Sequence, residues 1–224
     1  MKQLSITHLS IAVCLSALLF SSCSKDHDSK KRDFEPSFKT WYRISPLAKP
    51  VPIDVNGTAF VGFAHFPGGG TGTNKLLGNS TTYFNQLAYG NAPDAPPAGS
   101  VSAPIIEVPG YPVTGAPLPL IQAGDFNGLA GAISSWKIPE KVYDKIVNQV
   151  FYNDKGDAIF SSALTGEGST FPISQTVVGF NGKAVITGGR GKFRHAVGEF
   201  EYSGYFNIAN ANDAEYNAKG WISF

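Results

Sequence analysis

The chain of 224 residues carries a formal net charge of +1, and only 16% of its residues are charged. This balance gives no electrostatic basis for binding nucleic acid or an anionic membrane surface. Its 25 glycines, 15 prolines and 12% aromatic residues are typical of a β-rich domain with many turns, and the length suits one domain behind a targeting segment.

The first 22 residues are expected to be the targeting segment. Lys2 supplies a positive start, and residues 11–20 (IAVCLSALLF) form an apolar stretch too short to span a membrane stably. The sequence LFSSC that ends at Cys23 resembles a bacterial lipoprotein signal, in which the cysteine becomes the lipidated first residue. We therefore expect lipid attachment at Cys23 and a place in the cell envelope, anchored to the outer membrane and either periplasmic or surface-exposed. An ordinary secretory signal that is cut nearby is the alternative.

A polar tether is expected after the lipid. Residues 24–37 (SKDHDSKKRDFEPS) are charged and poor in large apolar side chains, so they cannot bury a core. We assign 23–55 to this tether and an irregular lead-in, and 56–224 to the folded domain. Because Cys14 leaves with the signal and Cys23 carries lipid, the sequence predicts no disulfide, no cysteine-ligated metal and no cysteine nucleophile.

Two strands with a loop between them are expected at the start of the domain. Residues 58–66 (TAFVGFAHF) form a continuous apolar run typical of a buried strand, and residues 80–89 (STTYFNQLAY) are β-branched and aromatic. The glycine-rich residues 67–74 (PGGGTGTN) between them are expected to be a flexible loop. A P-loop is excluded there, because no Lys-Ser or Lys-Thr pair follows the glycines.

Residues 90–125 form a long insertion rich in proline, which disfavours both a helix and a central strand. We interpret it as a surface wrap, with a lid over a cavity mouth as the alternative. Its large apolar residues indicate that part of it packs; these are Ile105, Ile106, Val108, Leu118, Leu120 and Ile121.

Strands and turns are expected through the second half. Residues 129–136 (LAGAISSW) are interpreted as a strand, and the segment after Pro139 as a short helix or irregular turn that gives way to a strand near Asn148. Residues 153–157 (NDKGD) form a turn before a further strand (DAIFSSAL). Asn181-Gly182 is expected to be the turn of a hairpin.

Within residues 185–206 (VITGGRGKFRHAVGEFEYSGYF), Gly188, Gly189, Gly191 and Gly198 interrupt what otherwise resembles two strands. A nucleotide or phosphate loop would be followed by a helix, whereas residues 198–209 alternate between apolar and polar, as a strand with one buried face does. The spacing Gly-x-Gly-x-x-Gly is also not met. We therefore expect a tight corner between antiparallel strands at 183–189 and 198–209, with Phe193 plugging the end of a barrel.

Residues 184–204 (AVITGGRGKFRHAVGEFEYSG) resemble a segment shared by allene oxide cyclases and dirigent proteins, in which G-G-x-G-x-F-x-x-A-x-G joins two late barrel strands. The closing strand at 219–224 (KGWISF) fits the same layout. Matching positions are Gly188, Gly189, Gly191, Phe193, Ala196 and Gly198.

This resemblance implies an all-β fold, namely an eight-stranded antiparallel, calycin-like β-barrel that is often a homotrimer and has a cavity for an apolar or phenolic ligand. Short strands with Gly, Pro and Asn turns independently favour a barrel or a sandwich, and eight strands leave room for one small molecule. The carboxylate and asparagine that catalyse in the plant cyclases lie on early strands. No stretch of 58–89 matches them, so cyclase activity is not carried over.

The ligand is expected to contact the apolar face of the strand at 198–209. In a closed barrel this face points inward, so Phe200, Tyr202 and Phe206 are predicted to line the lumen, with Tyr202 as the polar handle. The alternative is that these residues pack outward against a neighbouring subunit.

Few side chains suit catalysis. His8 and His27 precede the domain, the spacing of His65 and His195 does not resemble a metal site, and no Gly-x-Ser-x-Gly nucleophile motif occurs. We therefore predict no metal, no cofactor and no catalytic set. Three cations near the glycine corner are interpreted as a solvated turn, with an anion site as the alternative; these are Arg190, Lys192 and Arg194. Isolated polar groups that could line a cavity are His65, Glu107, Asp125 and Glu167.

The sequence thus favours a lipid-anchored β-barrel that binds a small apolar or aromatic molecule without catalysis. Two alternatives stay open: an isomerase or cyclase of the allene oxide cyclase type, and a structural cell-envelope protein with a filled barrel.

Overall fold

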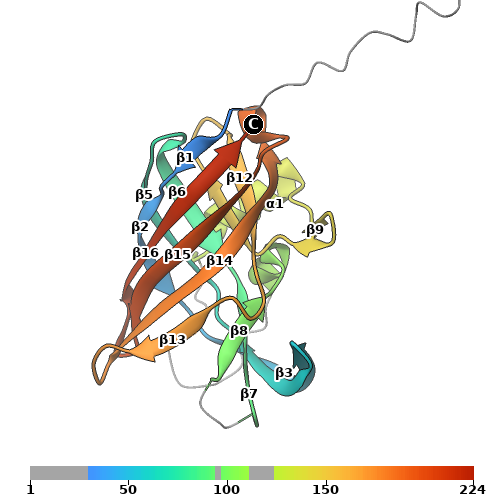
Figure 1. Ribbon diagram of the computed structural model, residues 1–224, viewed down its shortest axis with the longest axis vertical. Helices are drawn as coiled ribbons and strands as arrows, with labels where there is room; N and C mark the ends of the chain where they lie inside the picture. Colours follow the sequence, from blue (N-terminus) through green and yellow to red (C-terminus); the bar gives the residue numbers. More distant parts are fainter. Residues whose placement is uncertain (1–29, 94–96, 111–123) are drawn as a thin grey trace, which may run out of the picture.

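The computed structural model describes residues 30–93, 97–110 and 124–224, which form mostly β structure around one closed barrel (Figure 1). Eight antiparallel strands make the barrel; each pairs with the next, and the last pairs back with the first. In order around the barrel they are β2 (Ser37–Tyr42), β5 (Gly68–Asn74), β6 (Gly78–Phe84), β11 (Gln149–Tyr152), β12 (Ala158–Ala163), β14 (Val177–Arg190), β15 (Val197–Asn207) and β16 (Asn210–Ser223). The predicted eight-stranded antiparallel barrel is confirmed.

Smaller elements surround the barrel. β1 (Arg32–Phe34) pairs with β16, and β13 (Ser169–Pro172) pairs with the first part of β14. A second antiparallel sheet consists of β3 (Ser45–Val55), β4 (Thr58–His65), β7 (Gln86–Gly90) and β8 (Gly99–Ser102). The remaining elements are the 3-10 helix η1 (Ile105–Gly110), the helix α1 (Asn127–Trp136), the hairpin of β9 (Lys141–Val142) and β10 (Lys145–Ile146), and the 3-10 turn η2 (Gly191–Phe193). Among the described residues, no helix is both long and apolar enough to cross a membrane.

The strands begin earlier than the sequence indicates. β1, β2 and β3 lie within 23–55, for which we expect a tether and an irregular lead-in. Phe34 and Phe38 are fully buried in the barrel interior. β2 has the alternation of a strand with one buried face, but the charged residues before it obscure this pattern in the sequence.

The glycine-rich segment expected to be a flexible loop is a barrel strand, so that prediction is wrong. β5 pairs with β2 on one side and with β6 on the other. A Cβ at Gly70 or Gly72 would overlap the backbone carbonyl oxygen of Lys39 or Ser37 on the adjacent strand. Glycine therefore allows a close approach of two strands that any other residue would prevent. Although glycine usually weakens a strand, here it is required for strand pairing.

The two strands expected at the start of the domain are present, but they are divided between two sheets. β4 occupies residues 58–65 and lies in the second sheet, not in the barrel. Residues 80–89 form β6 in the barrel and β7 in the second sheet, with a break at Asn85. The buried Asn85 side chain donates a hydrogen bond of 2.9 Å to the carbonyl oxygen of Pro104, which secures this branch point.

Residues 129–136 form most of α1 and not a strand, so that prediction is wrong. Leu129, Ala132, Ile133 and Trp136 follow helical spacing, and they pack with Phe160 in a core on the outer side of the barrel. The same cluster contains Ile105 and Val108, which confirms that part of the proline-rich insertion packs. Leu118, Leu120 and Ile121 lie outside the described residues.

The segment after Pro139 is neither a short helix nor an irregular turn. It forms the β9–β10 hairpin, with Tyr143 and Asp144 at positive φ in the turn. The expected strand near Asn148 is confirmed as β11, and the expected strand after the turn at 153–157 is confirmed as β12.

Asn181-Gly182 does not form a turn, because β14 continues through it. The Tyr202 ring lies against Gly182, and a Cβ there would overlap its hydroxyl, so the barrel requires this glycine for packing. The chain reverses instead near Ser174, between β13 and β14. The antiparallel pairing expected around the glycine corner is confirmed by the β14–β15 ladder.

Candidate functional site

Phe200, Tyr202 and Phe206 point into the barrel, the direction that the alternation in β15 predicts. The Phe200 ring centroid is 5.1 Å from that of Phe34, and Tyr202 stacks at 5.7 Å on Tyr216 of β16. Phe206 contacts Tyr42 of β2. β2 and β15 are separated by β16, so this contact crosses the barrel interior. These three side chains therefore belong to the interior, and the structure does not show them on an outer face. Their role in ligand binding stays a prediction.

One end of the barrel is closed. Phe193 is fully buried and packs against Phe224 with ring centroids 4.6 Å apart, in the plugging position expected from the sequence. Phe34 and Phe151 fill the space beneath it and are also fully buried. Phe200 completes this packed half, so it is a core residue and is not accessible to a ligand.

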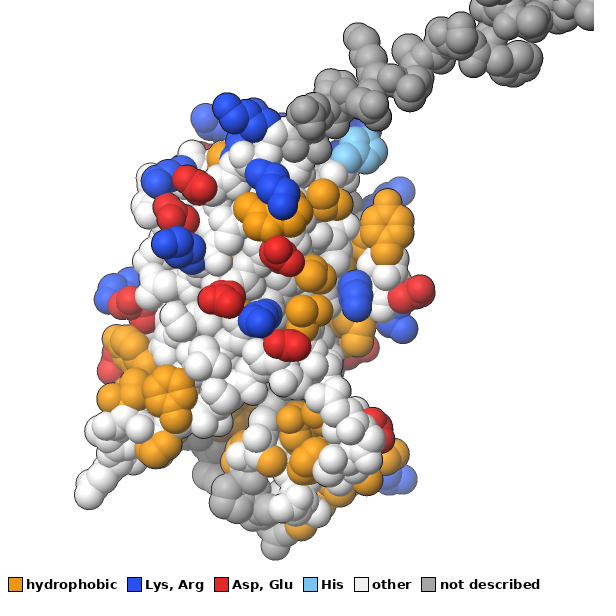
Figure 2. Space-filling model, in the orientation of Figure 1, with side chains coloured by type: hydrophobic (Ala, Val, Ile, Leu, Met, Phe, Trp, Pro, Cys, Tyr) orange, Lys and Arg blue, Asp and Glu red, His pale blue; other side chains and the backbone are white. Residues whose placement is uncertain are grey.

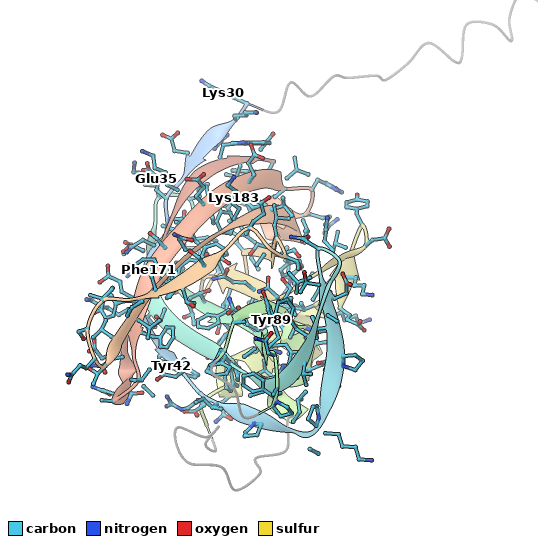
Figure 3. The ribbon with its side chains drawn as sticks, turned by 60° about the horizontal axis from the view of Figure 1, so that its bottom comes forward. Lys30, Glu35, Tyr42, Tyr89, Phe171 and Lys183 are labelled. Carbon is cyan, nitrogen blue, oxygen red and sulfur yellow. The ribbon has the colours of Figure 1, made fainter. Side chains whose placement is uncertain are left out.

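The opposite end has an aromatic lining that we call the aromatic mouth, defined by Tyr42, Phe180, Tyr202 and Phe206. Phe206 lies edge-on to Tyr42 at 5.2 Å and stacks with Phe180 at 6.3 Å. Phe180, Tyr202 and Phe206 are only partly buried, unlike the rings of the closed end. Figure 3 turns this end toward the viewer and labels Tyr42.

A short chain of hydrogen bonds lies beneath the aromatic mouth. The Tyr216 hydroxyl donates to Gln149 Oε1 at 3.2 Å, and Gln149 Nε2 donates to Thr82 Oγ1 at 3.2 Å. Ser161 is opposite Gln149 in the β11–β12 ladder and is fully buried. Within the part of the chain that the structure describes, its Oγ has no hydrogen-bond partner. The interior thus offers a buried hydroxyl beside a polar network.

The phenols of the interior are neutral at physiological pH. Burial raises the pKa of Tyr202 to about 12, and burial also raises the pKa of Tyr216 well above its ordinary value. Both hydroxyls therefore remain hydrogen-bond donors. The inward positions of the eight barrel strands, all of them described, carry no Asp, Glu, His, Lys, Arg or Cys.

The four isolated polar groups expected near a cavity are not brought together. Asp125 forms an ion pair with Arg43, and Glu167 is half-exposed near Lys183 at 3.5 Å. Glu107 is exposed on η1. His65 is buried in β4 of the second sheet.

Burial lowers the pKa of His65 to about 4 from the model-compound value of 6.5. The folded state therefore binds fewer protons than the unfolded state between these values, so the free energy of unfolding should fall as the pH drops from about 6.5 to about 4. His65→Gln is expected to remove this part of the pH dependence, measured by urea denaturation at several pH values. The His195→Gln variant, in which an exposed histidine is replaced, is the control. If the free energy of unfolding depends on pH equally in both variants, burial of His65 is not the source of this pH dependence.

The residues of the glycine corner hold the fold. Gly191 has a φ of 64°, and a Cβ there would overlap the Asp157 carboxylate. A Cβ at Gly189 would overlap the carbonyl oxygen of Ala158, and one at Gly198 that of Trp221. Ala196 and Phe193 are buried in the interior cluster.

The three cations of the glycine corner have different surroundings in the structure. Lys192 donates a hydrogen bond of 2.8 Å to the Leu76 carbonyl oxygen and lies 3.8 Å from Asp157. Arg190 lies 5.1 Å over the Trp136 ring. Arg194 directly follows η2 and is exposed.

Several interior residues beneath the aromatic mouth are not predicted from the sequence. Tyr216 was available from the alternation of Tyr216, Ala218 and Ile222 in the last strand. Gln149 and Ser161 carry no such signal, because a single polar residue in an apolar strand does not reveal its partner.

No protein-family model matches the chain, and no curated protein or solved structure is significantly similar to it.

Proposed function

We propose that this protein is a lipid-anchored β-barrel, similar to the allene oxide cyclase and dirigent barrels, that binds one small apolar or aromatic molecule without transforming it. The observation that carries the proposal is the contrast between the ends of the barrel. One end is packed with fully buried rings, whereas Phe180, Tyr202 and Phe206 at the other end keep part of their surface accessible.

The chemistry of the aromatic mouth fits such a ligand. Small-molecule sites are mostly apolar and have a few polar groups that fix the orientation of the ligand. Aromatic rings of the mouth supply edge-to-face and stacked contacts. The hydroxyl of Tyr202, which is only partly buried and stays protonated, supplies a polar group among these rings.

Binding is favoured over isomerase or cyclase activity. General acid–base catalysis needs a group with a pKa near the working pH. The inward strand positions carry no such group, and the pKa of Tyr202 is about 12. A ligand with a hydroxyl or carbonyl group is therefore held and oriented, not deprotonated.

The arrangement of the ends fits an anchor at Cys23. The described chain starts at Lys30, and β1 pairs with the end of β16 at the closed end (Figure 1). Arg32 lies 4.7 Å over the Phe224 ring there. An anchored barrel would thus have its closed end toward the membrane and its aromatic mouth toward the solvent.

A structural cell-envelope protein with a filled barrel is the second candidate. The packed half of the interior favours it, since Phe34, Phe151 and Phe193 leave no exposed surface there. The two candidates differ in whether the aromatic mouth takes up a ligand.

A binding experiment tests the proposal. The full chain in lipid nanodiscs is titrated with the neutral fluorophore 1-aminoanthracene, with empty nanodiscs as background. We expect saturable binding that Tyr202→Phe weakens about three- to tenfold, the effect of one lost hydrogen bond. Stability should barely change, because only a hydroxyl is removed.

Tyr205→Phe is the matched control, because Tyr205 lies on the outer face of β15 and donates its hydroxyl hydrogen to Asp213. Equal affinities for wild type and Tyr202→Phe, or equal losses in both variants, would contradict binding at the aromatic mouth. No saturable binding would favour the filled barrel.

The anchor has its own test. Cys23→Ala is expected to move the protein from the detergent phase to the aqueous phase in a detergent-partitioning assay, because acyl chains supply most of the membrane affinity. Ser22→Ala, which keeps a small residue before the cysteine, should partition like wild type. A Cys23→Ala protein that stays with the membrane would show that it is held there by something other than this lipid.

A further inference from the structure

A cleft of about 450 Å³ lies on the outer surface of the barrel. One wall comes from the end of α1 and the β9–β10 hairpin, and the other comes from the glycine corner between β14 and β15. Figure 1 shows α1 and β9 on the same side of the barrel. The aromatic mouth is inside the barrel, so the two sites share no residue.

The charged groups of the cleft are all cations. Lys137, Arg190 and Arg194 line it, together with His195, and no carboxylate does. Within the described ranges, none of the three cations forms an ion pair. Unpaired cations gathered around one cavity create a positive potential there, which favours an anion.

Apolar surface is also exposed in this cleft. Tyr143 is 87% exposed and Val197 is 47% exposed, although both line it. Val142 and Trp136 add to this surface from the same side. Figure 2 shows hydrophobic side chains on this side of the molecule, with cationic and acidic side chains around them. Apolar surface beside unpaired cations indicates a ligand with both an apolar body and a charge.

Arg190 is held in place at the cleft. Its guanidinium lies 5.1 Å over the Trp136 ring, and Trp136 packs edge-on against Tyr152 at 5.1 Å. An arginine ordered by stacking loses less conformational freedom when it forms paired hydrogen bonds with a planar anion.

We infer that this cleft binds a small aromatic carboxylate. Its carboxylate accepts paired hydrogen bonds from Arg190. Arg194 and Lys137 donate further charge-assisted hydrogen bonds to it, and its ring lies against Val197 and Tyr143. Arginine suits the two oxygens of a carboxylate, and charge-assisted hydrogen bonds are the stronger kind. This inference does not depend on the ligand proposed for the aromatic mouth.

The probe is 2-naphthoate, added to the ¹⁵N-labelled full chain in detergent micelles and followed by amide chemical shifts. We expect saturable shifts at residues 136–143 and 187–197. Arg194→Ala should weaken binding at least about fivefold, as the loss of a charge-assisted hydrogen bond predicts. Lys137→Asn should do the same; Lys137 has a φ of 53°, which asparagine tolerates, so this variant preserves the local backbone.

Lys192→Ala is the matched control, because it removes the same charge from the same loop but its amino group points to Leu76 and Asp157. Its affinity should stay within about twofold of wild type, and the neutral 2-naphthamide should bind at least about tenfold more weakly than 2-naphthoate. Equal losses in Lys192→Ala and Arg194→Ala, equal affinities for the acid and the amide, or no shifts at the cleft would each overturn the inference. These outcomes are separate from the 1-aminoanthracene result, which reports on the aromatic mouth.

Discussion

Replacing Asp125 with alanine is expected to lower the free energy of unfolding by about 3–5 kcal/mol, because it leaves a buried cation without its counter-charge. Arg43 Nε lies 2.8 Å from Asp125 Oδ2, and Nη2 lies 3.1 Å from Oδ1. Both side chains are nearly buried. The Arg43 guanidinium also donates to the Tyr42 carbonyl oxygen and to Asn212, so it cannot turn to the solvent without breaking these bonds.

The pair joins parts of the chain that are far apart in sequence. Arg43 follows β2, Asp125 precedes α1, and Asn212 lies at the start of β16. Urea denaturation measures the effect. Glu35→Ala is the control, because its partner Lys75 lies at a similar distance of 2.9 Å but the pair is exposed, and exposed pairs contribute little to stability. Equal losses of unfolding free energy in the two variants would show that burial does not increase the contribution of the Arg43–Asp125 pair to stability.

Gly72→Ala is expected to destabilise the barrel by about 3 kcal/mol or more, because the added Cβ overlaps backbone atoms that cannot move independently. The atoms are the Ser37 carbonyl oxygen and the Phe38 Cα, both on β2. Relief would require β2 and β5 to separate along their ladder. A glycine in a flexible loop would behave differently, since alanine there reduces the entropy of the unfolded chain and tends to stabilise.

Gly131→Ala is the matched control within α1. Nothing lies within 4 Å of a Cβ at this position, and alanine in a helix interior is favoured over glycine by about 0.5–1 kcal/mol. Thermal unfolding should therefore shift in opposite directions for the two variants. A Gly72→Ala protein as stable as wild type would mean that residues 68–74 are a loop in solution.

Alternating side chains were sufficient to predict much of the barrel. β15 repeats apolar and polar residues with a period of two, and this pattern gave both the strand and the inward direction of Tyr202. The structural role of the glycine corner could be predicted for a different reason. A phosphate-binding loop is followed by a helix, whereas the residues after these glycines have the alternation of a strand.

The wrong predictions have a common physical cause, which is that tertiary contacts overrule local preference. Asn181-Gly182 favours a turn in isolation, yet the Tyr202 ring needs the space at Gly182. β5 is built from residues with poor strand propensity because its neighbours approach too closely for a side chain. Neither contact is visible in a window of ten residues.

The candidate site was predictable only in part. The direction of Tyr202 follows from its own strand, whereas the Tyr216–Gln149 hydrogen bond joins residues 67 apart in sequence. Arg43 and Asp125 are 82 apart, and the sequence indicates Asp125 only as an isolated polar group that could line a cavity. Such pairs depend on which distant segments become neighbours in the fold, and a local sequence pattern does not reveal this.

Native mass spectrometry tests most directly whether the aromatic mouth holds a ligand. The full chain is extracted from its own membrane in a mild detergent and released from the micelle in the gas phase. We expect a population heavier than the lipidated chain by one small molecule, reduced in Tyr202→Phe and unchanged in Tyr205→Phe. A spectrum with only the mass of the lipidated chain, together with no saturable uptake of 1-aminoanthracene, would contradict this expectation and leave a filled, structural barrel.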